Sequence, residues 1–233
     1  MSGKLKIPTP ASSAGSVPAE TVGELFAEAT KQHQSGEMEQ AIDLYRRLLL
    51  RFPSYAPAWN NLGVALRAMD RFAAGVSALR RGIALNPKDA GALSNLGNAL
   101  RAIGEYEEAV AAHEASLAID PKQGRVHYNL ALAQRDLGHL EVALAGFKSA
   151  EMCGFKSSEM FWDRALTLLV AGEIEQGFRE YEWRWQLPES PPRFTNIEVW
   201  DGRPYDGKTL LIHTEQGFGD TIQFLRYLPR AAA

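Results

Sequence analysis

Residues 56–89 read APAWNNLGVALRAMDRFAAGVSALRRGIALNPKD, and this 34-residue stretch decides the fold. The same frame recurs every 34 residues, without a gap, and its copies start at Val22, Ala56, Ala90, Gly124 and Ser158. An internal period of this length is typical of arrays in which each unit is one pair of helices. The pattern therefore predicts five repeats, over residues 22–55, 56–89, 90–123, 124–157 and 158–191, with helices spanning 22–186.

Small residues punctuate every copy at the same places. The eighth residue is Ala29, Gly63, Gly97, Ala131 or Ala165, and the twentieth is Ala41, Gly75, Ala109, Ala143 or Gly177. The fifteenth is Gly36, Asp70, Gly104, Gly138 or Gly172. Small side chains let two helices cross closely, and Gly or Asp suits the turn after a helix. Each copy is therefore expected to hold a helix, a tight turn and a second helix.

Within residues 56–89, the apolar positions follow a helical period. Trp59, Leu62 and Leu66 share one helix face, and Asn86 with Pro87 marks the end of the second helix. One such pair cannot bury its apolar face alone, so neighbouring repeats must stack, and roughly three or more are needed for stability. The predicted fold class is all-α, a right-handed solenoid of helix pairs.

These residues resemble the tetratricopeptide repeat family. The segments WNNLGVAL, LSNLGNAL and YNLALAQ are similar to its first-helix pattern, and YEEAV followed by Asp120-Pro121 is similar to its second half. The resemblance covers residues 22–185 and implies a protein-binding scaffold. It names no particular partner, because such arrays bind many unrelated proteins.

Composition places the 233-residue chain among ordinary soluble proteins, with 45% hydrophobic residues and a net charge of −3. Basic and acidic residues are interspersed, so no stripe for nucleic-acid phosphates is expected. The single cysteine, Cys153, excludes an internal disulfide and fits a reducing compartment, and we expect it to be buried near a helix end. We expect no cofactor and no metal site.

The N-terminal segment, residues 1–21, is rich in Pro, Ser, Ala and Gly, and we expect it to be disordered. It lacks the apolar run of a secretory signal, and no stretch reaches the roughly 18 apolar residues that a membrane span needs. The expected localisation is cytoplasmic.

The fifth repeat departs from the pattern and leads into a different region. Its second helix, predicted over residues 174–186, carries Phe178, Tyr181, Trp183 and Trp185. These aromatics form either a partner-binding patch or a cover for the open end of the array, where a cap is needed. Residues 187–199 are a proline-rich linker.

Residues 200–233 follow a different pattern. The apolar run at 208–213 predicts a buried strand, 214–220 (TEQGFGD) a glycine turn, and 221–228 an amphipathic helix. Strand, glycine turn and helix open many nucleotide-binding α/β domains, and the alternative is a tight turn with Asp220 as a helix cap. We expect the apolar side of this helix, with Ile222, Leu225 and Leu228, to pack on the last repeat or on another copy. Self-association through this short α/β fragment is therefore a further expectation.

This segment resembles the start of the heptosyltransferase-like glycosyltransferase domain that follows tetratricopeptide repeats in many bacterial proteins. The resemblance implies an acceptor-side loop formed by Gly217 and Gly219, with Asp220 at the position of a proposed base. A two-domain enzyme of this type needs on the order of 100–150 residues for each half. Residues 200–233 are too few, so we expect a truncated start of such a domain.

Two functions of different class remain open. The first is a non-catalytic module that binds an extended peptide or protein in the groove of the array. The second is the N-terminal part of a glycosyltransferase whose repeats present an acceptor protein. Whether the chain is an enzyme is left open, although the 233 residues as given are not expected to catalyse a reaction.

Candidate groove residues follow from the position within each first helix. At about 100° per residue, the sixth position falls at about 200° from the fourth, away from the core. That position holds Asn61, Asn95, Asn129 and Asp163. First helices line the inner surface in the resembled family, so we expect an asparagine ladder that grips a peptide backbone through paired donors and acceptors. The alternative is that these are merely exposed positions of the helices. The twelfth position holds Arg67, Arg101 and Arg135, a flanking row suited to acidic side chains.

Overall fold

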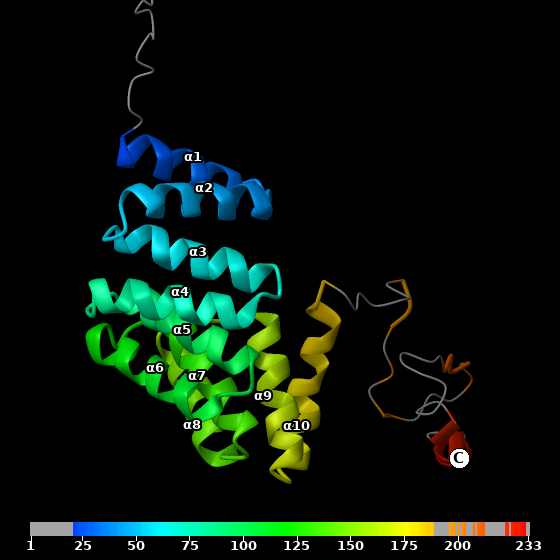
Figure 1. Cartoon of the computed structure of the whole chain (residues 1–233). Helices are drawn as coiled ribbons and strands as arrows, with labels where there is room; N and C mark the ends of the chain where they lie inside the picture. Colours follow the sequence, from blue (N-terminus) through cyan, green and yellow to red (C-terminus); the bar gives the residue numbers. More distant parts are fainter. Residues whose placement is uncertain are drawn as a thin grey trace, which may run out of the picture. The chain divides into compact units, whose positions relative to one another are not determined.

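Five helix pairs follow one another from Val22 onward in the computed structural model (Figure 1). The structure describes residues 21–188, 196–198, 200, 202–203, 207, 209–212, 222–223 and 225–231. The first helices are α1 (Val22–Gln34), α3 (Ala56–Ala68), α5 (Ala90–Ala102), α7 (Gly124–Asp136) and α9 (Ser158–Val170). All five begin at the first residue of a copy of the 34-residue frame.

The second helices are α2 (Met38–Arg51), α4 (Phe72–Leu85), α6 (Tyr106–Ile119), α8 (Leu140–Met152) and α10 (Ile174–Tyr181). The predicted helix over 174–186 changes type part-way, because η1 (Glu182–Gln186) continues α10 as a 3-10 helix. Helix α4 ends at Leu85 with Asn86 as its C-cap, as the following proline requires. Thr21 begins the array with a reciprocal capping box that it shares with Glu24.

The turn inside each repeat needs a left-handed backbone at its fifteenth residue. The φ angles there are 85° at Gly36, 83° at Gly104, 81° at Gly138 and 86° at Gly172. Asp70 takes the same conformation with φ 56°, and it is the only non-glycine residue with positive φ in the described part of the chain. Aspartate tolerates this region better than most residues, which explains why it can replace glycine here.

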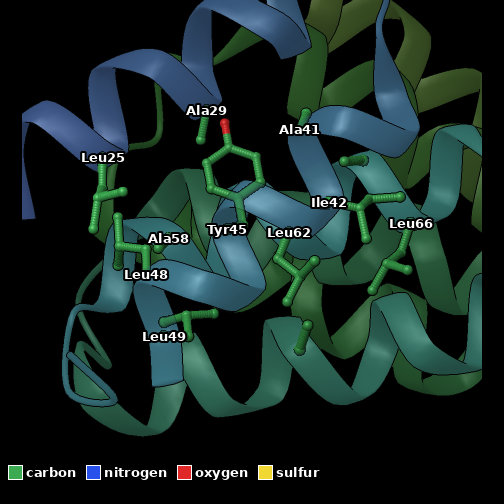
Figure 2. Packing of buried hydrophobic residues seen from close by; sticks show 12 residues of the cluster. Leu25, Ala29, Ala41, Ile42, Tyr45, Leu48, Leu49, Ala58, Leu62 and Leu66 are labelled. Carbon is green, nitrogen blue, oxygen red and sulfur yellow. The ribbon is translucent and has the colours of Figure 1, made fainter. Parts of the chain in front are cut away.

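In the first four repeats the core forms around the twenty-fourth residue. Tyr45, Leu79, His113 and Phe147 occupy this position on α2, α4, α6 and α8, and all four are fully buried. Figure 2 shows Tyr45 among the buried side chains of the first two repeats, with Ala29, Leu48 and Leu62 around it. The cluster joins α1 to α4, so no repeat has a core of its own.

Consecutive helices pack against each other throughout the array, and the first helices also contact one another: α1 with α3, α3 with α5, α5 with α7, and α7 with α9. The second helices show no contact of comparable extent among the described residues. In a curved stack of helix pairs, the helices on the inner side lie closer together than those on the outer side. The row of first helices therefore forms the inner surface, called the first-helix row below.

The C-terminal end of the array is covered by its own aromatics. The Trp183 ring stacks on Phe161 with centroids 4.5 Å apart, and Tyr181 lies 4.5 Å from Trp162. Arg164 takes the place of a core leucine and bonds Glu151 of α8 and Glu180 of α10, both at 2.7 Å. These contacts support the cap interpretation for Trp183 and Tyr181, whereas Phe178 stays 58% exposed.

The chain divides into two compact units, Met1–Ser190 and Pro191–Ala233. In the second unit, the buried strand predicted at 208–213 is wrong for its described residues, since 209–212 form no strand and Leu211 and Ile212 are 51% and 55% exposed. A single segment without a partner strand has no ladder to join. The helical prediction holds in part: Ile222 and Gln223 are helical, followed by η2 (Leu225–Tyr227) and α12 (Leu228–Ala231).

The sequence predicts burial of Cys153 and of the apolar side of the helix over 221–228. Cys153 is exposed rather than buried, because it is the C-cap residue of α8 and its side chain lies beyond the packed core. Ile222, Leu225 and Leu228 are 69%, 50% and 36% exposed, so burial of this apolar side is not observed. No helix in the described part of the chain combines the length and apolarity needed to cross a membrane.

Candidate functional site

The sixth-position residues lie half-buried on the first-helix row, at the junctions between neighbouring repeats. Asn95 of α5 donates from Nδ2 to Oδ1 of Asn60 on α3, at 3.0 Å. Asn61 donates from Nδ2 to the Tyr45 hydroxyl at 3.3 Å. Two of the three predicted ladder amides are thus bonded within the protein. Asn129 is different, because its side chain makes no hydrogen bond with any residue that the structure describes.

Asp163, the fourth member of the ladder, is a hub that joins α7 to α9. It accepts a hydrogen bond from the Tyr128 hydroxyl at 2.6 Å and pairs with Arg135 Nη1 at 2.7 Å. Burial, followed by the bond to this carboxylate, raises the pKa of Tyr128 well above its ordinary range. Tyr128 therefore stays protonated and keeps donating to Asp163.

The arginine row is largely neutralised inside the protein. Arg101 Nε lies 2.6 Å from Asp136 Oδ2, and Arg135 pairs with Asp163 and lies 3.6 Å from Asp136. The side chains of Arg101 and Asp136 are only 32% and 20% exposed, so this pair is partly shielded from solvent. Arg67 alone of the three makes no ion pair with any described residue. The predicted row of three equivalent cations is thus reduced to one.

A hollow of about 520 Å³ opens on the first-helix row, and we call it the inner hollow. Its walls come from α3, α5 and α7 together with the start of α6. The lining residues are Arg67, Asn98, Arg101, Ala102, Tyr106, Arg125, Asn129 and Asp136. The structure therefore brings together three of the predicted groove residues, Arg67, Arg101 and Asn129, while Asn61, Asn95, Arg135 and Asp163 lie outside this lining.

Four polar residues of the inner hollow were missed by the sequence reasoning: Asn98, Tyr106, Arg125 and Asp136. Asn98 and Arg125 occupy the ninth and second positions of their repeats, where neighbouring copies hold Val64 and Gly91. A search for residues that recur in register cannot find them, because each occurs in one copy only. Arg125 lies over the Phe155 ring, with its guanidinium carbon 5.3 Å from the ring centroid.

The chemistry of the inner hollow suits binding. Its side chains supply two amides, three guanidinium groups, one phenol and one carboxylate, whose polar atoms can hydrogen-bond a polypeptide. In the described part of the chain, no group of three or more His, Cys, Asp and Glu side chains could hold a metal ion. The predicted loop residues Gly217, Gly219 and Asp220 lie outside the described residues.

Family models of the tetratricopeptide repeat match residues 26–90 and 78–111, and a TPR repeat model matches residues 97–138. Protein FlbA of Caulobacter vibrioides is 42% identical over 72 residues, which are 30% of this chain and 12% of FlbA. The match thus spans about an eighth of that curated relative. Nothing in these comparisons supports a glycosyltransferase domain.

Solved structures share the fold at low sequence identity. MamA from Desulfovibrio magneticus RS-1 superposes with a TM-score of 0.65 at 17% identity, covering 73% of this chain and 96% of that one. YrrB, described as a TPR protein with an unusual peptide-binding site, superposes with a TM-score of 0.60 at 13% identity, covering 73% and 88%. The family models show that residues 26–138 consist of tetratricopeptide repeats, and helix pairs with the same 34-residue period continue on both sides of the matched residues.

Proposed function

We propose that the array is a protein-interaction module that binds an extended polypeptide along the first-helix row. The observation that carries this proposal is the inner hollow, a cavity of about 520 Å³ whose walls come from three successive repeats. A ligand that spans several repeats gains contacts from each of them, which suits an extended chain. The right-handed superhelix expected for the array would give such a chain a continuous path.

Two amides in the inner hollow are available for a ligand. The side chains of Asn98 and Asn129 make no hydrogen bond with any described residue, yet both line the hollow. Each amide offers a donor and an acceptor, the complement of a peptide unit, whatever the ligand's side chains. YrrB, which shares the fold, is described as having a peptide-binding site, and this likeness adds support.

The test begins with capture of a partner by the full chain from a lysate of the organism that encodes it. Binding of the captured protein is then measured by calorimetry for wild type and for the double variant Asn98→Ala/Asn129→Ala. We expect affinity to fall about tenfold or more, since each lost hydrogen bond is worth about 1 kcal/mol. Because both amides are unbonded within the array, the thermal midpoint should shift by no more than about 2 °C.

The matched control removes two amides from second helices, Gln40→Ala on α2 and Gln176→Ala on α10. This control should bind the partner as wild type does. Undiminished binding by Asn98→Ala/Asn129→Ala would place the binding surface elsewhere on the array. The original ladder remains part of the proposal, but its other members, Asn61 and Asn95, are less suitable for testing because their loss also removes internal hydrogen bonds.

A second candidate function rests on residues 214–220, TEQGFGD, and their resemblance to an acceptor loop of heptosyltransferase-like enzymes. In that case the array, in the cytoplasm, would present an acceptor protein to a catalytic domain, with Asp220 as the base. The test is nucleotide-sugar hydrolysis by the product of the complete reading frame, with Asp220→Asn as the comparison. Equal hydrolysis by both proteins would remove Asp220 from the mechanism, and no hydrolysis by either would remove this candidate.

A further inference from the structure

We propose that the inner hollow selects an acidic peptide segment, whose Asp or Glu carboxylates are held by Arg67 and Arg125. This proposal rests on the proposed function and specifies the chemistry of its ligand. The sequence pattern predicts a row of arginines at one repeated position. The two proposed cations instead occupy different positions, since Arg67 lies at the end of α3 and Arg125 at the start of α7.

The charge balance of the inner hollow is the first argument. Three arginines and one carboxylate line it, and that carboxylate, on Asp136, is already bonded to Arg101 at 2.6 Å. Neither Arg67 nor Arg125 forms an ion pair with any described residue. The hollow therefore carries two uncompensated positive charges in a protein whose net charge is −3.

The ion pairs of Arg101 and Arg135 support the same conclusion. Arg101 and Arg135 each have an aspartate within 2.7 Å, so the array supplies carboxylates to the arginines that hold its repeats together. No such partner exists for Arg67 and Arg125 in the described part of the chain. A guanidinium group matches a carboxylate with two parallel hydrogen bonds, so an external Asp or Glu is its natural partner.

Nucleic acid would offer anions too, but the lining does not suit it. Single-stranded nucleic acid is typically held by several aromatic rings on which successive bases stack. The inner hollow contains one aromatic residue, Tyr106, beside the amides of Asn98 and Asn129. Amides complement a peptide backbone, so cations and amides together favour an extended acidic peptide.

Fluorescence anisotropy on the full chain can test the proposal with two labelled peptides. One has glutamate at every second position, so that its carboxylates face one side of an extended chain, and the other has glutamine at those positions. We expect the acidic peptide to bind and the glutamine peptide to bind at least about tenfold more weakly. Binding of the acidic peptide should also weaken as salt is added, because partly exposed charges are screened.

Variants then locate the interaction. Arg67→Gln/Arg125→Gln should weaken binding of the acidic peptide by roughly a hundredfold, about tenfold for each arginine. The control Arg46→Gln/Arg81→Gln removes the same charge from the second helices α2 and α4 and should bind as wild type does. Equal loss in both double variants would reduce the effect to overall charge and overturn the proposal.

Two further results would also overturn it: equal binding of the acidic and glutamine peptides, and displacement of the acidic peptide by an equimolar RNA oligonucleotide. Failure of this proposal is distinguishable from failure of the proposed function. The acidic peptide could fail to bind while Asn98→Ala/Asn129→Ala still weakens binding of the captured partner. In that case the inner hollow remains the binding site, and only its preference for acidic peptides is wrong.

Discussion

His113 is the residue that departs most from its counterparts in the other repeats. Tyr45, Leu79 and Phe147 take the same position, but His113 is buried with neither ring nitrogen hydrogen-bonded to any residue that the structure describes. Burial, and then the nearby charge of Arg101, lowers the pKa of His113 to about 4. A polar ring placed in a core without a partner costs stability, even when it is neutral.

This burial predicts a pH-dependent stability. In the unfolded chain His113 gains a proton as the pH falls below about 6.5, whereas in the folded protein it does so only near a pKa of about 4. The unfolded state binds more protons between these values, so the free energy of unfolding decreases as the pH falls through this window. The full difference corresponds to about 3 kcal/mol, from 1.36 kcal/mol per pKa unit.

The variant His113→Leu reproduces the pairing of Leu79 with Gly63, because Gly97 faces His113 as Gly63 faces Leu79. We expect it to be more stable than wild type, by a margin that grows from pH 7 to pH 4.5, in urea unfolding followed by circular dichroism. His33 also has a pKa lowered by burial, and its contribution is common to both proteins. The exposed His139→Leu should keep the wild-type pH dependence. An unchanged pH dependence in His113→Leu would contradict the prediction.

At the scale of the helices, Gly63 marks a close crossing of α3 and α4 in the second repeat. A Cβ atom on Gly63 would lie 2.5 Å from Leu79 Cγ and 3.0 Å from the Gly75 carbonyl oxygen. The first distance is shorter than real Cβ contacts show, and the second is unusually tight and involves backbone that cannot rotate away. The glycine at this crossing therefore sets the distance between α3 and α4. Alanine takes the eighth position in repeats one, four and five.

Gly63→Ala is accordingly expected to destabilise the protein by about 1–3 kcal/mol through overpacking, despite the better helix propensity of alanine. The matched control is Gly23→Ala on α1, where a Cβ atom would meet only Thr21 Oγ1 at 4.0 Å. The Gly23→Ala variant should instead be more stable than wild type by up to about 1 kcal/mol. Chemical denaturation of both variants gives the comparison, and equal stabilisation in both would show that α3 and α4 can separate freely.

At the scale of the molecule, stability rests on contacts between neighbouring repeats. All buried residues in the described part of the chain lie between Leu25 and Gly177, within α1 to α10. Trp183 of η1 extends this packing by stacking on Phe161. In a linear array each repeat depends mainly on its neighbours. A truncation at one end should therefore leave the other repeats folded, unless it removes the residues that cover the last repeat.

A chain of residues 1–188 should therefore retain its helical signal and melt within about 3 °C of the full chain. Ending the chain at residue 171 instead removes α10 and η1, and exposes Phe161 and Leu169, against which Trp183 and Gly177 pack. This second truncation should lower the melting temperature by roughly 10 °C. Calorimetry of the three proteins distinguishes these cases, and equal melting of both truncations would show that η1 is no cap.

The sequence by itself determined the order of helices α1 to α10 and where their repeats begin. Helix starts at Val22 and Ala56, and the left-handed turn at Asp70, follow from local requirements that recur every 34 residues. Turns, helix ends and amphipathic faces are properties of neighbouring residues, so they can be predicted without knowing what packs against them. The strand predicted at 208–213 is not observed at its described residues 209–212, because a strand depends on a partner strand and the described residues provide none.

Only the tertiary structure decided which polar residues remain available to a ligand. Arg101 and Asp136 are 35 residues apart, as are Asn60 and Asn95, and Tyr128 and Asp163. Each pair joins a residue to the residue one position later in the frame of the next repeat. This offset comes from how the repeats stack, so the helical period within one repeat does not reveal it. The stacking uses Arg101 internally and leaves Arg67 and Arg125 for the inner hollow. Chemically equivalent side chains thus acquire different roles through their neighbours in the adjoining repeat.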